Sequence, residues 1–264
     1  MRAAPPAPTR LDHGSGLAIT LDVDWAPDHV IDAVAAPLID AQVRATWFVT
    51  HASAAVDRLR EHDELFELGI HPNFMAGLSH GVTVAEVIGH CMALVPDARV
   101  MRTHGLVQSS RLFTEILSLS PIRIDSSLML RGHPGLQAIR QPFEGGVLTR
   151  LPVWWEDDIE QIAPDPNWFV TAPAPPGLRI LNFHPVHLLL NGCTPATYAA
   201  LKREWPVLSN TPMHAFSALR RDGIGPASAF ESAISVLAQS GGGMTLSSLC
   251  GDAARRPRLT PVLS

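Results

Sequence analysis

Residues 17–25 read LAITLDVDW, an apolar and β-branched run that ends in two aspartates, Asp22 and Asp24. The run predicts a buried strand with both acids at its carboxyl end. Because residues two apart on a strand share a face, we expect the two carboxylates to lie together. Such a pair can share a cation, so that one carboxylate binds a metal and the other accepts a proton. Alternatively, the two aspartates have only a structural role, and each caps a turn in the loop that follows the strand.

Outward from this run, strand-like and helix-like segments alternate. The further predicted strands are RATWFVTH (44–51), LGIH (68–71), ARVMRTH (98–104), IRIDSS (122–127), LRILNFHPVHLLLN (178–191) and MTLSSL (244–249), and GVLTRLPVWWEDD (146–158) is predicted to be an extended segment that ends in acids. Segments with apolar residues at helical spacing lie between most of them, and Thr83 with Glu86 predicts a capping box. The alternation predicts an α/β fold with a mainly parallel sheet. We expect a flexible arm at 1–16, one domain at 17–250 and a C-terminal tail at 251–264.

Composition excludes several classes of protein. The net charge is -5, which argues against a nucleic-acid partner, because non-specific binding needs a basic surface. The three cysteines are too few and too scattered for a disulfide framework or a zinc–thiolate site. We expect no membrane span, since no apolar run approaches about 20 residues. The N-terminus shows no secretory signal, so the expected location is cytoplasmic.

Polar side chains follow most of the predicted strands. The strand ends carry Asp22 and Asp24, His71, Arg102 and His104, the run Glu156–Asp158, and His184. In α/β folds, ligands bind at the carboxyl ends of the strands. Acids, imidazoles and a guanidinium at one rim are suited to a divalent metal with a nearby acid and base. His187 would take the opposite strand face from His184, so one of this pair is expected to be structural.

In their order, these motifs resemble those of the NodB-homology polysaccharide deacetylases, carbohydrate esterase family four. The similar segments are TLDVDW (20–25), ATWFVT (45–50), GIHPNF (69–74), RTHG (102–105), WWEDD (154–158), LNFH (181–184) and GGGMTLSSL (241–249). A bacterial subgroup of this family, associated with surface-polysaccharide gene clusters, has segments similar to GIHPNF, RTHGLVQSSRL and FHP of this chain.

The resemblance implies a distorted (β/α) barrel and a hydrolase that removes an acetyl group from an acetylated amino sugar or related amide. It implies one divalent metal, usually zinc, held by one Asp and two His, with Asp24 and His71 as two of the ligands. Asp22 would be the base, His184 the acid, and Arg102 would hold Asp22 ionised. The substrate would be a carbohydrate or small amide; the oligomeric state stays open.

Two departures from the family pattern leave alternatives open. Met75 stands where the family has its second histidine, so His80 is our expected third ligand, with His104 and Asn73 as rivals. The segment near Trp155 matches poorly. We place His104, Trp155 and Asp157 on the substrate side of the site.

Other functions compete with deacetylation. A degenerate family member would bind sugar or metal without turnover. A phosphatase of the haloacid dehalogenase type also opens with DxD, but it needs a lysine before its acidic pair, and the only lysine, Lys202, follows Asp157 and Asp158. A DxD glycosyltransferase would need more chain before Asp22.

Overall fold

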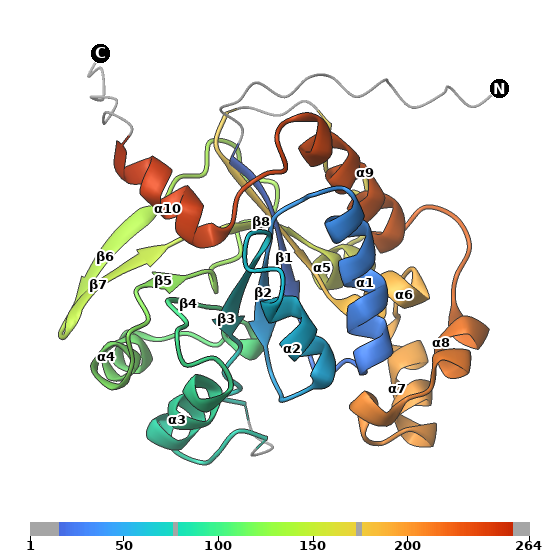
Figure 1. Cartoon of the computed structure of the whole chain (residues 1–264), viewed down its shortest axis with the longest axis horizontal. Coiled ribbons are helices and arrows are strands. Elements are labelled where there is room, and N and C mark those ends of the chain that lie inside the picture. The colour runs from blue at the N-terminus through green and yellow to red at the C-terminus, as the bar shows by residue number, and fades with distance from the viewer. Residues whose placement is uncertain (1–15, 76–78, 173–175, 256–264) are drawn as a thin grey trace.

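The computed structural model describes residues 16–75, 79–172 and 176–255, and their central feature is one nine-stranded sheet (Figure 1). The strands are β1 (Gly16–Asp22), β2 (Ala45–Val49), β3 (Phe66–Ile70), β4 (Val100–Met101), β5 (Ile124–Asp125), β6 (Ile139–Phe143), β7 (Gly146–Arg150), β8 (Val153–Glu156) and β9 (Leu178–Phe183). Their order is β6-β7-β5-β4-β3-β2-β1-β9-β8. Neighbouring strands run parallel except in the β6–β7 hairpin.

The sheet curls toward closure because the segment after β5 reaches β8. Met129 forms a parallel bridge with Val153, Leu130 N donates to Val153 O at 2.9 Å, and Val153 N donates to Leu128 O at 2.8 Å. An irregular segment, not a full strand, thus closes the ring, which is therefore a distorted barrel. The predicted α/β class with mainly parallel strands is confirmed.

Helices surround the barrel, and the last of them packs against its interior residues. They are α1 (Asp28–Asp40), α2 (Ala54–Arg60), α3 (Val84–Leu94), α4 (Ser110–Leu119), α5 (Asp157–Ile162), α6 (Pro185–Leu190), α7 (Pro195–Glu204), α8 (Met213–Leu219), α9 (Pro226–Gln239) and α10 (Leu246–Arg255). The predicted capping box of Thr83 and Glu86 begins α3. Within the described ranges, none of these helices is both long and apolar enough to cross a bilayer.

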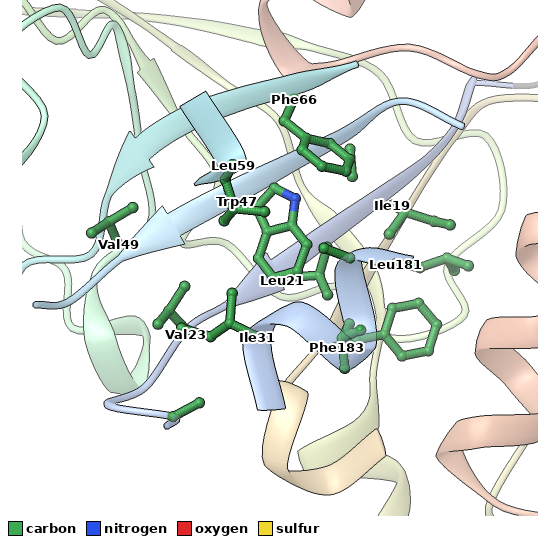
Figure 2. Close-up of a cluster of buried hydrophobic side chains, with 14 of the residues drawn as sticks. Ile19, Leu21, Val23, Ile31, Trp47, Val49, Leu59, Phe66, Leu181 and Phe183 are labelled. Atoms are coloured by element: carbon green, nitrogen blue, oxygen red, sulfur yellow. The ribbon is translucent and has the colours of Figure 1, made fainter. Parts of the chain in front are cut away.

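Strand alternation divides the buried residues of β1 between two environments. Ile19 and Leu21 join Trp47, Leu181 and Phe183 in the core beneath the helices (Figure 2). Their neighbours along the strand face the barrel interior. There Ala18 packs in a second cluster that includes Leu246 and Leu249 of α10, while Thr20 and Asp22 contact polar groups instead. The carboxyl end of β1 therefore presents polar side chains on one face, while its other face packs in the hydrophobic core.

Two predicted strands were wrong in the second half. Residues 244–249 belong mostly to helix α10, because Leu246 and Leu249, three apart, pack together into the inner cluster. The long run 178–191 is β9 followed by α6, since Pro185 occupies the first helical turn, where its missing N–H costs nothing.

The predicted domain boundaries, 16/17 and 250/251, fall inside a strand and a helix of the structure. Gly16, assigned to the arm, begins β1, and residues 251–255, assigned to the tail, continue α10. The rest of the predicted arm and tail, 1–15 and 256–264, lies outside the described residues.

Candidate metal and catalytic site

The strand ends gather the predicted polar residues at one rim of the barrel. Asp22 ends β1, while His71, Arg102 and His184 directly follow β3, β4 and β9. The backbone ladder continues past the strands, because His71 N donates to Val49 O at 3.1 Å and Arg102 N to Ile70 O at 3.2 Å. These bonds fix where the side chains emerge.

Asp24 reaches the rim through a left-handed turn. Asp24 and Trp25 have φ of 45° and 56°, a conformation that costs a non-glycine residue free energy and often marks functional sites. Trp25 N donates to Thr50 Oγ1 at 3.0 Å, which holds the turn. Asp24 thus arrives from a turn beyond the strand, and not from the strand face that we expected.

Asp24, His71 and His104 form a candidate metal-binding group. Asp24 Oδ1 lies 3.1 Å from both His71 Nε2 and His104 Nδ1, and the two ring nitrogens are 3.4 Å apart. One ligand atom from each residue falls within 4.8 Å of the others. One carboxylate oxygen and two imidazole nitrogens are a donor set that zinc and similar divalent ions accept. The residues present therefore suit the metal that the sequence implies.

Asp24 and His104 stabilise each other's charged forms. Burial alone would raise the pKa of Asp24, but hydrogen bonds from His104 and His71 hold it well below its usual range. Burial would lower the pKa of His104, yet the hydrogen bond to Asp24 raises it overall. Trp25 packs edge-on against the His104 ring, with centroids 5.3 Å apart, and so helps to fix its position.

His80 does not join this group. Its Nδ1 accepts from Asn73 N at 3.1 Å, and its Nε2 contacts Thr50 O at 2.8 Å, so both ring nitrogens already have partners. Burial lowers the pKa of His80 to about 4. Asn73 is also engaged elsewhere, through Ser79 and Met75. In place of His80, our expected third ligand, the structure brings His104 beside Asp24 and His71.

Asp22 lies behind the metal-binding group in a buried network. Arg102 Nη1 donates to Asp22 Oδ1 and to Thr20 Oγ1, each at 2.9 Å, while Asn182 Nδ2 donates to Asp22 Oδ2 at 2.9 Å. Burial would raise the pKa of Asp22, but the charges of Arg102, His71 and His184 lower it. The arrangement keeps an ionised carboxylate under the rim. Arg102 contacts Asp22, so its expected role is to position that carboxylate.

His184 approaches the same spot from the other side. Its Nε2 lies 3.8 Å from Asp22 Oδ2 and 3.7 Å from Asp24 Oδ2, while its Nδ1 lies 2.6 Å from Asp157 Oδ1. Asp157 Oδ2 also accepts the His184 backbone N–H at 2.8 Å. Burial would lower the pKa of His184, but the Asp157 charge raises it well above the usual value. The geometry yields an imidazolium aimed at the two aspartates.

Two residues that we placed on the substrate side lie elsewhere. Trp155 is buried in the core, where its Nε1 donates to Asn167 O at 2.6 Å and its ring packs on Phe183. Asp157 is fully buried and holds His184. Trp155 was placed on the substrate side only through a family motif that this segment matches poorly, and its side chain instead packs in the core at a register shift of β8 between Val153 and Trp155.

Three further residues, to which the sequence predictions gave no role in the site, contribute to it. Asn182 bonds Asp22 and Arg102, and its position two residues before His184 on one strand was an available signal. Glu156 offers an oxygen near Asp22 and His184, and burial raises its pKa to about 7. His187 shares Asp157 with His184, at 3.5 Å, because the two histidines are three apart at the start of a helix.

A pocket of 480 Å³ opens from these residues toward α7. Its lining includes Asp24, His104 and His184 of the site, and Tyr198 and Lys202 of α7. Small-molecule sites typically enclose about 300–1,000 Å³, so the pocket has room for a sugar unit.

Comparisons with known proteins identify the family of the chain. The family of WbmS-like polysaccharide deacetylases matches residues 19–202. WbmS from Bordetella bronchiseptica, described as a polysaccharide deacetylase involved in O-antigen biosynthesis, has a similar crystal structure: TM-score 0.70, 30% identity, 83% of this chain and 89% of that one covered.

Two further solved structures are less similar. The Bc1960 peptidoglycan N-acetylglucosamine deacetylase has a TM-score of 0.44 and 12% identity, with 90% of this chain and 89% of that one covered. The peptidoglycan deacetylase PdaC from Bacillus subtilis has a TM-score of 0.45 and 13% identity, with 92% of this chain and 94% of that one covered. No curated protein matches the sequence. The family match spans well over half of the chain, and WbmS is similar over most of its length, so the chain belongs to the WbmS-like polysaccharide deacetylases.

Proposed function

We propose that the protein is a metal-dependent hydrolase that removes an acetyl group from an acetylated amino sugar. The observation that carries this proposal is the meeting of Asp24, His71 and His104 directly beside Asp22 and His184. By analogy with WbmS, described as involved in O-antigen biosynthesis, the substrate would be a surface saccharide or its precursor. The cytoplasmic location stays a prediction.

Asp24, His71 and His104 would hold the divalent ion, with zinc as the first candidate for this donor set. When bound, such an ion acts as a Lewis acid on the amide carbonyl and makes water more acidic. The chain's own residues supply the proton transfers.

Asp22 is the proposed general base. Arg102 and Asn182 fix its two oxygens, and its lowered pKa keeps it ready to take a proton from the attacking water. His184 is the proposed general acid, because Asp157 keeps it protonated and its Nε2 faces the reaction site. Its proton passes to the leaving nitrogen as the carbon–nitrogen bond breaks, which gives acetate and a free amine.

The test is metal content and acetate release measured on the same purified protein. We expect a divalent ion near one equivalent, acetate released from an acetylated amino sugar, and loss of both in Asp24→Ala. Bound metal without acetate release from any acetamido sugar would favour the degenerate alternative, in which the protein binds without turnover.

A further inference from the structure

The pocket beside the metal-binding group is lined by two chemically different sets of side chains. Asp24, His104 and His184 come from the site itself. Tyr198 and Lys202 of α7 line the same pocket. Apolar side chains, among them Val186 and Leu208, line it as well. A substrate whose acetamide lies beside the metal-binding group would therefore share the pocket with an apolar surface and with the side chains of α7.

Lys202 carries a positive charge that this part of the fold leaves unneutralised. Its Nζ lies 4.9 Å from the centre of the Tyr198 ring, one helical turn earlier, so a cation–π contact orients the ammonium. Among the residues that the structure describes, no carboxylate lies within 4.0 Å of Lys202. Asp158, also in the pocket lining, lies 3.3 Å from His187 instead.

We propose that Tyr198 and Lys202 form a subsite for an anionic group of the substrate, a carboxylate or a phosphate. An ammonium is a compact charge with three donors, and such a group pairs with anions through charge-assisted hydrogen bonds. The subsite assigns the substrate class, an acetylated amino sugar that bears a negative charge away from its acetamide. This inference rests on the proposed function for the position of the acetamide.

Acetate release from three probes tests the subsite: methyl N-acetylglucosaminide as the neutral probe, N-acetylglucosaminuronic acid for the carboxylate and N-acetylglucosamine 1-phosphate for the phosphate. The variants are Lys202→Gln and Lys202→Glu. Arg203→Gln is the matched control, because Arg203 is exposed on the same helical turn but outside the pocket lining.

We expect kcat/KM for at least one anionic probe to fall about 10–100-fold in Lys202→Gln and further in Lys202→Glu, as for loss of a hydrogen bond to a charged group. The neutral probe and Arg203→Gln should change less than about twofold, well below that range. The anionic probe that loses more identifies the group as carboxylate or phosphate. Equal losses for neutral and anionic probes, or the same loss in Arg203→Gln, would overturn the subsite.

Equilibrium binding separates this inference from the proposed function. The same probes are titrated calorimetrically into metal-loaded wild-type protein and the Lys202 variants. If no probe releases acetate, the proposed function fails, while weaker binding of an anionic probe to Lys202→Glu alone still supports the subsite. If all three probes bind wild type and Lys202→Glu equally, or none binds the wild type, the subsite is wrong.

Discussion

Arg102 Nη1 donates a 2.9 Å hydrogen bond to Asp22 Oδ1 where neither side chain reaches solvent. The guanidinium also bonds the Ser126 carbonyl at 2.9 Å and stacks 4.6 Å above the Phe48 ring. A buried charge pair of this kind adds little net stability, but removal of one partner isolates the other. The pair therefore fixes the ionisation of Asp22 more than it stabilises the barrel.

Arg102→Met should destabilise the protein and shift its acid pH limit. The free energy of unfolding should fall by about 3–5 kcal/mol, because Asp22 is left buried without its counter-charge. Loss of that positive charge raises the pKa of Asp22, so the acid limb of kcat/KM should move to higher pH. Urea unfolding and a pH–rate profile measure both effects. An unmoved acid limb in a folded variant would show that Arg102 does not set the ionisation of Asp22.

Asp22→Asn and Asp24→Asn should differ in kind. Asp22→Asn removes the proton acceptor and should cut turnover by about 10²–10⁴-fold with metal content intact. Asp24→Asn removes a charged ligand and should lower metal affinity. Metal analysis and acetate release on both variants decide the roles. Equal metal loss in the two would show that both aspartates bind the ion.

His104→Ala should lose metal, whereas His80→Ala should keep it. His104 Nδ1 lies beside Asp24, while both nitrogens of His80 contact other groups. His80→Ala should instead reduce stability, because Asn73 N and Thr50 O lose their partner. Zinc titration and thermal unfolding of both variants make the comparison. The reverse pattern of metal loss would restore His80 as the third ligand.

The site residues that directly follow strands could be predicted from the sequence, because parallel strands pair in a regular register. His71 and Arg102 each follow an apolar run, and the pairing of Ile70 with Met101 brings the residues after those two runs side by side. The same pairing brings His104 to His71 across 33 residues of sequence. Closeness in sequence favoured His80, but its ring is held by the loop and by β2's end, which no local pattern reveals.

The errors elsewhere have local physical causes. MTLSSL carries two leucines three apart, which suits a helix, but a short partly apolar run with a β-branched threonine is also typical of a strand. Packing of Leu246 and Leu249 in the inner cluster decides for the helix. Trp155 was placed on the substrate side only by a motif that matches poorly, and its burial comes from packing against Phe183, which no local pattern reveals.

Asp157→Asn should move the alkaline limit of activity downward. Asp157 accepts the His184 Nδ1–H and is the main charge that raises the pKa of His184. Without that charge the imidazolium loses its proton at lower pH, so the alkaline limb of kcat/KM should fall by about 1–3 pH units. Metal content should not change. Asp158→Asn, at an exposed neighbour, is the control and should shift the limb less. An unmoved limb in Asp157→Asn would remove His184 from the role of general acid.

Glu156→Gln should make the metal-free protein more stable above neutral pH. Glu156 is buried, and among the described residues its Oε2 has no hydrogen-bond partner. Burial raises its pKa from an ordinary 4.5 to about 7. Between these values the folded state binds more protons than the unfolded state, so stability falls as pH rises from 4.5 to 7 and stays lower above.

Glutamine keeps the shape without the charge and should remove this loss, which is on the order of 3 kcal/mol. Urea unfolding at pH 5 and pH 8, in chelator so that no metal stabilises the folded state, measures it. The wild-type and Glu156→Gln curves should lie close at pH 5 and separate at pH 8, with the variant more stable. Asp158→Asn, whose parent carboxylate is largely exposed, should show no such separation. Equal destabilisation of Glu156→Gln at both pH values would mean that Glu156 stays ionised in the folded protein and that its charge helps to hold the site together.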